Sequence, residues 1–121
     1  MLFHILTRGA WEAAQQRGEY GAASLETEGF IHLSTARQWL ATANRFYRGQ
    51  PDLVLLGLEP DRLHAPVRYE AADGDEFPHL YGPVNLEAVV GVWALPVEVG
   101  GVIGVPSGLA DLAPGTRDTV R

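Results

Sequence analysis

An uninterrupted apolar run at residues 53–58 is the feature that most restricts the fold. It reads LVLLGL, contains no polar residue and shows no alternation. A half-buried strand alternates apolar and polar side chains, whereas a strand covered on both faces does not. Turn-forming residues precede the run at Gly49 and Pro51 and follow it at Pro60. The run therefore predicts a central strand whose sheet is covered on both faces.

Other elements can be placed around this strand by their apolar spacing. Thr35 is expected to begin the longer of two helices, because Gln38 three residues later would complete a capping box. Gly18 is expected to end the shorter helix. We predict strands at residues 2–7, 30–33, 67–70 and 89–95, helices at residues 10–17 and 36–47, an ordered loop at 19–28, a loose turn at 71–76 and a rigid segment at 77–83. This order is typical of an α+β domain.

The chain of 121 residues suits one domain, and no internal repeat or long linker divides it. From Pro96 onward glycine and proline become frequent and large side chains become rare. We therefore expect a single α+β domain at residues 1–106 and a weakly ordered C-terminal tail at residues 107–121.

The charge pattern restricts the partners. The formal net charge is -6, so a basic face for a nucleic-acid backbone is not expected, although a few arginines would suffice for one phosphate group.

No apolar run approaches the roughly 20 residues that cross a membrane. The N-terminus lacks the basic region of a signal peptide, which favours a cytoplasmic protein. The pattern does not indicate an oligomeric state.

Three of the four histidines, namely His4, His32 and His79, lie in apolar segments. A single histidine of this kind is most simply a core residue with a hydrogen-bond partner, but three in one small domain indicate a functional cluster. They lack the close spacing of a zinc-binding pair, and the chain has no cysteine. No metal is therefore expected, and a metal-dependent hydrolase is the less favoured alternative.

Ser34, Glu70 and Tyr81 are the other candidates. Ser34 precedes a helix N-terminus, where its hydroxyl would satisfy backbone N–H groups or form the floor of a ligand site. Glu70 would act as a general base or orient a ribose hydroxyl, or it would be an edge-strand carboxylate paired with Arg68 or another arginine, and the two interpretations are level. Tyr81 would stack on a base or pack beneath the proline-rich segment at residues 77–83.

A series of motifs carries a resemblance to a known family. The series comprises His4, GFIHLST at residues 29–35, Gln38, ANRFY at 43–47, DLVLL at 52–56, RYE at 68–70 and FPHLYGP at 77–83. In this order the motifs resemble the mostly bacterial family called domain of unknown function 952. The resemblance extends from about residue 2 to residue 95 and leaves out the glycine-rich tail.

This family is similar to the ADP-ribosyltransferase superfamily, whose small domains bind NAD. The resemblance implies a split or curved β-sheet of about six strands with two main helices. It implies an NAD-type or nucleotide-type ligand, held by His4, His32, Ser34 and Tyr81. A catalytic role in cleavage or transfer at the nicotinamide–ribose bond would fall to Glu70, His32 and His79. The alternative is a non-catalytic ligand-sensing or interaction module that keeps the pocket.

Overall fold

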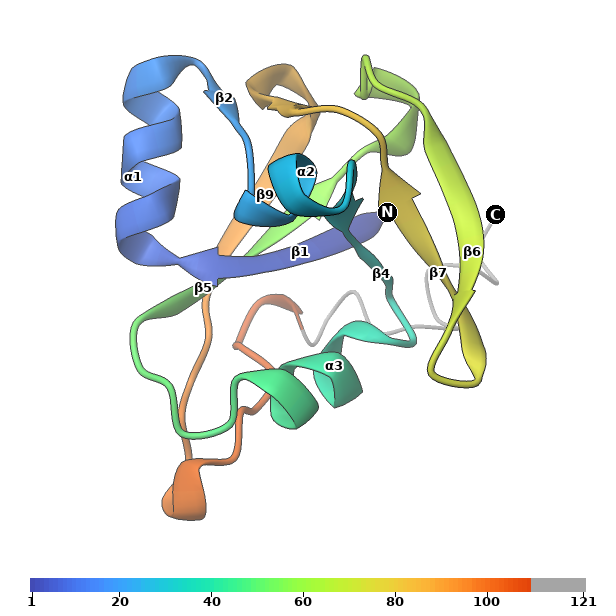
Figure 1. The fold of residues 1–121 in the computed structure, drawn as a ribbon. Helices are drawn as coiled ribbons and strands as arrows, with labels where there is room; N and C mark the ends of the chain where they lie inside the picture. The colour runs from blue at the N-terminus through green and yellow to red at the C-terminus, as the bar shows by residue number, and fades with distance from the viewer. Residues whose placement is uncertain (110–121) are drawn as a thin grey trace.

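A computed structural model describes residues 1–109, and residues 110–121 lie outside the described part. Most of the predicted tail at residues 107–121 therefore lies outside it, while Leu109 is buried in the core. The elements, drawn in Figure 1, are β1 (Leu2–Thr7), α1 (Arg8–Arg17), β2 (Glu19–Tyr20), α2 (Ala23–Thr27), β3 (Ile31–His32), β4 (Ser34–Thr35), α3 (Trp39–Phe46), β5 (Leu53–Leu58), β6 (Val67–Ala72), β7 (Asp75–Leu80), β8 (Val84–Asn85) and β9 (Val89–Ala94).

The largest sheet is antiparallel, with strand order β4-β1-β5-β9. All six residues of β5 are buried, which confirms the predicted central strand. Val54, Leu56 and Leu58 join a core cluster that includes Ala14 of α1, whereas Leu53 and Leu55 join a second cluster with side chains of α3. The two faces of the sheet are thus covered by different layers, as the unbroken apolar run requires.

A second sheet has the order β3-β7-β6, and β2 pairs with β8 in a small third sheet. The segment at residues 31–35 links the two larger sheets, because β3 pairs with β7 while β4 pairs with β1. Leu33 is buried between them, and its N–H donates to the carbonyl of Pro78 at 3.0 Å. The chain therefore passes from one sheet to the other within five residues (Figure 1).

Three local predictions were wrong or incomplete. The segment at residues 19–28 is not a plain loop, because it contains β2 and α2. Residues 71–76 form no loose turn: β6 and β7 continue into a tight hairpin with positive φ angles at Asp73 (53°) and Gly74 (81°), typical of a type I′ turn. The first part of the segment predicted to be rigid, residues 77–80, belongs to strand β7.

The start of α3 also differs from the prediction. The helix begins at Trp39, after a turn closed by the Gln38 N–H and the Thr35 carbonyl at 3.0 Å. The Gln38 side chain does reach back, and its Oε1 accepts the Thr35 N–H at 3.0 Å. The Thr35 hydroxyl has no hydrogen-bond partner among the described residues. Half of the predicted capping box is present, and it closes a turn ahead of the helix.

About six strands were predicted, and residues 1–109 contain five strands of six residues and four of two residues. Two main helices, α1 and α3, were predicted, and the short α2 was not. The α+β class is confirmed. No helix in this part of the chain combines the length and apolar character needed to span a membrane.

Trp93 packs over two glycines that face each other on β5 and β9, Gly57 and Gly91. A Cβ on Gly57 would lie 2.9 Å from the Trp93 ring, and one on Gly91 would overlap it. Gly91→Ala should therefore displace the indole and lower the free energy of unfolding by about 2 kcal/mol, measured by urea denaturation. Gly9→Ala is the control, because nothing lies within 4 Å of that position in α1 and alanine favours a helix. Equal stability of Gly91→Ala and the native protein would contradict the packing account.

Candidate functional site

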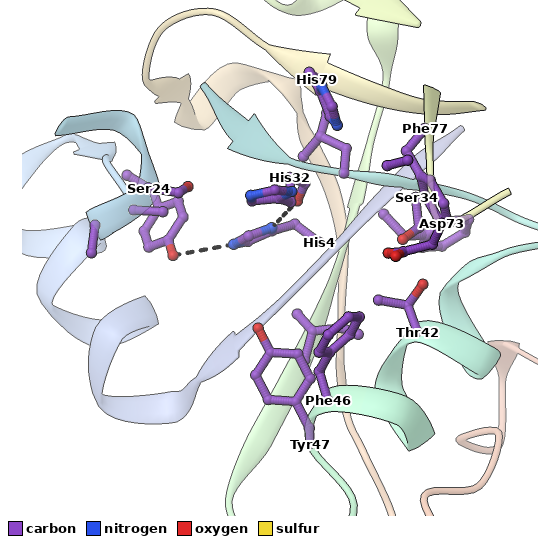
Figure 2. Close-up of a pocket in the computed structure, with 17 residues that line it drawn as sticks. His4, Ser24, His32, Ser34, Thr42, Phe46, Tyr47, Asp73, Phe77 and His79 are labelled. Atoms are coloured by element: carbon purple, nitrogen blue, oxygen red, sulfur yellow. Dashed lines mark hydrogen bonds between the residues drawn. The ribbon is translucent and has the colours of Figure 1, made fainter. Parts of the chain in front are cut away.

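A cleft of about 560 Å³ lies where the two larger sheets meet (Figure 2). It is mainly aromatic, with polar groups contributed by several elements. Its walls come from β1, α3, the segment from β2 to α2, the β6–β7 hairpin, and the segment at residues 31–35 that links the two larger sheets, called here the crossing segment. The lining residues are Phe3, His4, Ile5, Tyr20, Ala22, Ala23, Ser24, His32, Leu33, Ser34, Thr42, Phe46, Tyr47, Ala72, Asp73, Phe77 and His79.

The cleft follows from the short pairing of β4. This strand pairs only with Leu2 and Phe3, so within residues 1–109 the same edge of β1 has no partner strand from His4 onward. The chain has by then passed through Leu33 into the second sheet. A sheet edge left unpaired offers free backbone groups, and here that edge borders the cleft.

His4 lies in the centre of the cleft wall with both ring nitrogens in hydrogen bonds (Figure 2). Its Nδ1 is 2.8 Å from the carbonyl oxygen of His32, which can only accept, so Nδ1 carries the proton. Its Nε2 therefore accepts a hydrogen bond from the Tyr20 hydroxyl at 3.1 Å. Burial lowers the pKa of His4 to about 4, against the opposing effect of the His32 carbonyl. His4 is thus neutral at pH 7 and joins β1, β2 and the crossing segment.

The tyrosine hydroxyls of the cleft are protonated at neutral pH. Burial, with a contribution from nearby Tyr47, raises the pKa of Tyr20 to about 12. Burial also raises the pKa of Tyr47 above its usual value. Both rings line the cleft, so they present apolar faces with neutral polar tips.

His79 is held by a carboxylate on the neighbouring strand. Its Nδ1 lies 2.7 Å from Oε1 of Glu70, and the Tyr81 hydroxyl donates to the same oxygen at 2.5 Å. The hydrogen bond from Tyr81, followed by that from His79, lowers the pKa of Glu70. The Glu70 carboxylate in turn raises the pKa of Tyr81. The ring of Phe30 stacks on the His79 ring with centroids 4.0 Å apart.

His32 lies next to His79 but is much more exposed. The two residues are partners in the pairing of β3 with β7, and their ring centroids are 5.4 Å apart. The Nε2 atom of His32 lies 3.1 Å from Oε2 of Glu28, just beyond the end of α2. The His32 side chain is 55% exposed and the Glu28 side chain 49%. An ion pair this exposed contributes little to stability.

Charged groups are concentrated at one rim of the cleft. Asp73 of the hairpin turn forms an ion pair with Arg45 of α3 at 3.4 Å, and the Arg45 guanidinium lies over the ring of Phe46 at 5.0 Å. No arginine is among the lining residues of the described chain. The cleft is therefore lined mainly by aromatic rings, Asp73 is its one lining carboxylate among the described residues, and Arg45 contacts it through Asp73.

The structure brings four of the six predicted site residues to the cleft: His4, His32, Ser34 and His79. Glu70 and Tyr81 do not line it: Glu70 is connected to it through the His79 ring, and Tyr81 bonds to Glu70. The predicted alternative for Glu70, a pair with Arg68, is not its main contact, because the Arg68 guanidinium lies over the Tyr81 ring. Within residues 1–109 no group of three potential metal ligands is found.

Sequence reasoning missed several lining residues. Tyr20 and Ser24 lie in the segment that was expected to be a loop, and its mixed composition carried no signal for a wall of the site. Tyr47 ends the helix predicted at residues 36–47, where a tyrosine that packs on the core and one that faces a cleft have the same spacing. Asp73 was placed in a solvated turn. Only the contact between distant segments identifies these residues.

Comparison with known proteins identifies relatives over most of the chain. A family profile described as "Protein of unknown function (DUF952)" matches residues 5–92. The crystal structure of protein CC0527 from Caulobacter crescentus is 37% identical, with a TM-score of 0.80, covering 92% of this chain and 96% of that chain. The solution NMR structure of the same protein is 37% identical, with a TM-score of 0.75, covering 93% and 96%. The search of curated proteins finds no match.

Proposed function

This chain belongs to the DUF952 family, and we propose that its cleft binds a nucleotide-type small molecule such as NAD. The observation that carries the proposal is the convergence of His4, His32, Ser34 and His79 on one aromatic cleft between two sheets. A cleft of about 560 Å³ with a few polar groups among aromatic rings has the size and character of a ligand site. The split sheet and the histidine on the first strand are also the features in which the chain resembles ADP-ribosyltransferases.

The charge distribution favours one orientation of the ligand. The interior of the cleft, with its tyrosine and phenylalanine rings, suits the nicotinamide ring and its ribose. A pyrophosphate would be poorly accommodated there, because no arginine is among the described lining residues. It would instead lie at the rim, where Arg45 contacts Asp73. We therefore propose that the nicotinamide end enters and the phosphates face outward.

The reaction that we propose is cleavage or transfer at the nicotinamide–ribose bond. Its transition state develops positive charge on the ribose, which hydrogen-bond acceptors and carboxylates in the site stabilise. His32 and His79 lie in the cleft wall, and Glu70 acts on the cleft through His79. The enzyme would thus be similar to ADP-ribosyltransferases or NAD glycohydrolases.

One observation favours a non-catalytic alternative, a ligand-sensing module. Both ring nitrogens of His4 are already hydrogen-bonded to protein groups. The Oε1 atom of Glu70 likewise accepts hydrogen bonds from His79 and Tyr81. Groups satisfied in this way stabilise a pocket without taking part in chemistry. The two functions differ in whether bound NAD is consumed.

The proposal is tested by an NMR titration of the full chain with NAD, following backbone amides and the nicotinamide signals for a day. Amide shifts around the cleft are expected, and Thr42→Trp should abolish them because the indole fills the cleft from α3. Ala41→Trp is the matched control, since Ala41 is exposed on the same helix and does not line the cleft. Slow loss of NAD would identify an enzyme and stable NAD a sensor. Shifts that are equal in both variants, or absent at millimolar NAD, would contradict the proposed site.

A further inference from the structure

We propose that His79 is the proton acceptor of this cleft and that Glu70 is the residue that positions it. The inference rests on the proposed function, because the reaction considered is attack on the nicotinamide ribose of NAD. It departs from the expectation that the Glu70 carboxylate itself contacts the substrate, since Glu70 does not line the cleft.

The hydrogen bonds of Glu70 fix the tautomer of His79. Because Tyr81 and His79 lower the pKa of Glu70, its carboxylate is ionised at neutral pH and can only accept. The Nδ1 atom of His79, 2.7 Å from this carboxylate, must therefore carry the proton. In the neutral imidazole with this tautomer, the Nε2 atom keeps its lone pair, which is the form that a general base requires.

The Nε2 atom has no other use in the described part of the chain. His79 is 4% exposed, and its Nε2 is a buried atom with no hydrogen-bond partner among residues 1–109. A buried acceptor without a partner destabilises a fold, so such atoms call for an explanation. Phe30, stacked on the ring at 4.0 Å, and the bond to Glu70 hold the ring in place. The ring is thus fixed in the cleft wall with its basic nitrogen unsatisfied.

A ligand reaches this nitrogen by taking the position of the His32 ring. The His32 ring lies at 75° to that of His79 with centroids 5.4 Å apart, and it is the more exposed of the two. Its one side-chain hydrogen bond among the described residues goes to the exposed Glu28. To displace His32 and bond to Nε2 of His79, a ligand donor that enters the cleft has to replace this exposed hydrogen bond and the edge contact of His32 with the Phe30 ring.

The chemical step follows from this arrangement. The oxygen of a water molecule, or of a hydroxyl acceptor, forms a bond to C1′ of the nicotinamide ribose. The bond from C1′ to the ring nitrogen breaks, and its electron pair stays on nicotinamide, which leaves as a neutral molecule. The proton of the attacking oxygen passes to Nε2 of His79. The resulting imidazolium is stabilised by the Glu70 carboxylate until solvent removes the proton.

The first test needs no ligand. Nitrogen-15 NMR of the free full-length protein should show His79 as the Nδ1–H tautomer at neutral pH, and Glu70→Ala should shift the population toward Nε2–H. Finding the Nε2–H tautomer in the native protein would overturn the proposal. In His32→Ala, diethyl pyrocarbonate should modify His79 faster than in the native protein, as followed by mass spectrometry. Unchanged protection of His79 would overturn the access route.

The second test measures NAD consumption. His79→Gln and Glu70→Ala should each lower turnover by about 10²–10⁴-fold, the usual contribution of general base catalysis. His64→Gln is the control, because His64 is exposed and lies outside the cleft. Native turnover in folded His79→Gln, or NAD that binds to the native protein without being consumed, would overturn the base role. Absence of NAD binding would instead refute the proposed function, and the tautomer would still be tested separately.

Discussion

Lowering the pH from 6.5 to 4 should reduce the free energy of unfolding by about 3 kcal/mol through His4 alone. The folded protein holds the pKa of His4 at about 4, whereas the unfolded chain has the ordinary value of 6.5. Between these values the unfolded state binds a proton that the folded state does not, so stability falls as the pH falls. Below about pH 4 both states are protonated and the loss is complete. Urea denaturation at several pH values measures the effect.

Carboxylates also contribute to acid sensitivity, so the pH range matters. The pKa values of Glu70 and Asp75 are held below their usual 4.5 and 3.8, and their contributions are lost only as the pH falls through that lower range. The comparison therefore belongs between pH 6.5 and 4.5. In this range, His4→Gln should remove most of the dependence of the free energy of unfolding on pH. His64→Gln should retain that dependence, because His64 is exposed. The same slope in all three proteins would show that His4 is not the residue responsible.

Replacing Gln38 by leucine should lower the free energy of unfolding by about 3 kcal/mol, because the substitution leaves buried partners without hydrogen bonds. The Gln38 side chain is buried and accepts the Thr35 N–H at 3.0 Å. Its Nε2 donates to the carboxylate of Asp75 at 2.9 Å and to the carbonyl of Glu76 at 2.7 Å. One side chain thus joins the start of α3 to the β6–β7 hairpin. Leucine has a similar volume but makes none of these bonds.

Arg37→Ala is the matched control for this measurement. Arg37 is the preceding residue and pairs with the same Asp75 at 3.5 Å, but its side chain is exposed. Exposed ion pairs contribute about 0–1 kcal/mol, so this variant should be nearly as stable as the native protein. If both substitutions had the same small effect, the hydrogen bonds of Gln38 would not be the link that holds the hairpin.

The parts of the fold that the sequence predicts are those set by local pattern. The run at residues 53–58 predicts a doubly covered strand because a strand with one face in water would alternate apolar and polar residues, and turn-forming residues bound the run on both sides. The strand predicted at residues 30–33 contains β3, but the short α2 and the strands β2, β4 and β8 were not predicted, because segments of two to five residues carry too little periodicity. A turn was predicted at residues 71–76, and the type I′ turn at Asp73 and Gly74 lies within that segment. The strands β6 and β7 extend further toward the turn than the pattern indicated.

The histidines of the candidate site were predictable, but their hydrogen-bond partners and several other lining residues were not. Histidines in apolar segments indicated a cluster, and three of them lie in the cleft wall. The partner of His4, however, is Tyr20, from a segment without a recognisable pattern. The bond between Glu70 and His79 depends on the register of β6 against β7, which no local signal specifies. Contacts between distant segments therefore account for what the sequence left open.

The segment at residues 31–35, which belongs to both larger sheets, also has a consequence for the folding reaction. The segment joins each sheet through a pairing of residues far apart in the chain: Leu2 pairs with Thr35, and Ile31 pairs with Leu80. Such non-local pairings make folding slow compared with that of helical bundles. Because the same five residues take part in both closures, the two sheets cannot become ordered independently. The site at their junction should therefore be assembled late and in a single cooperative transition.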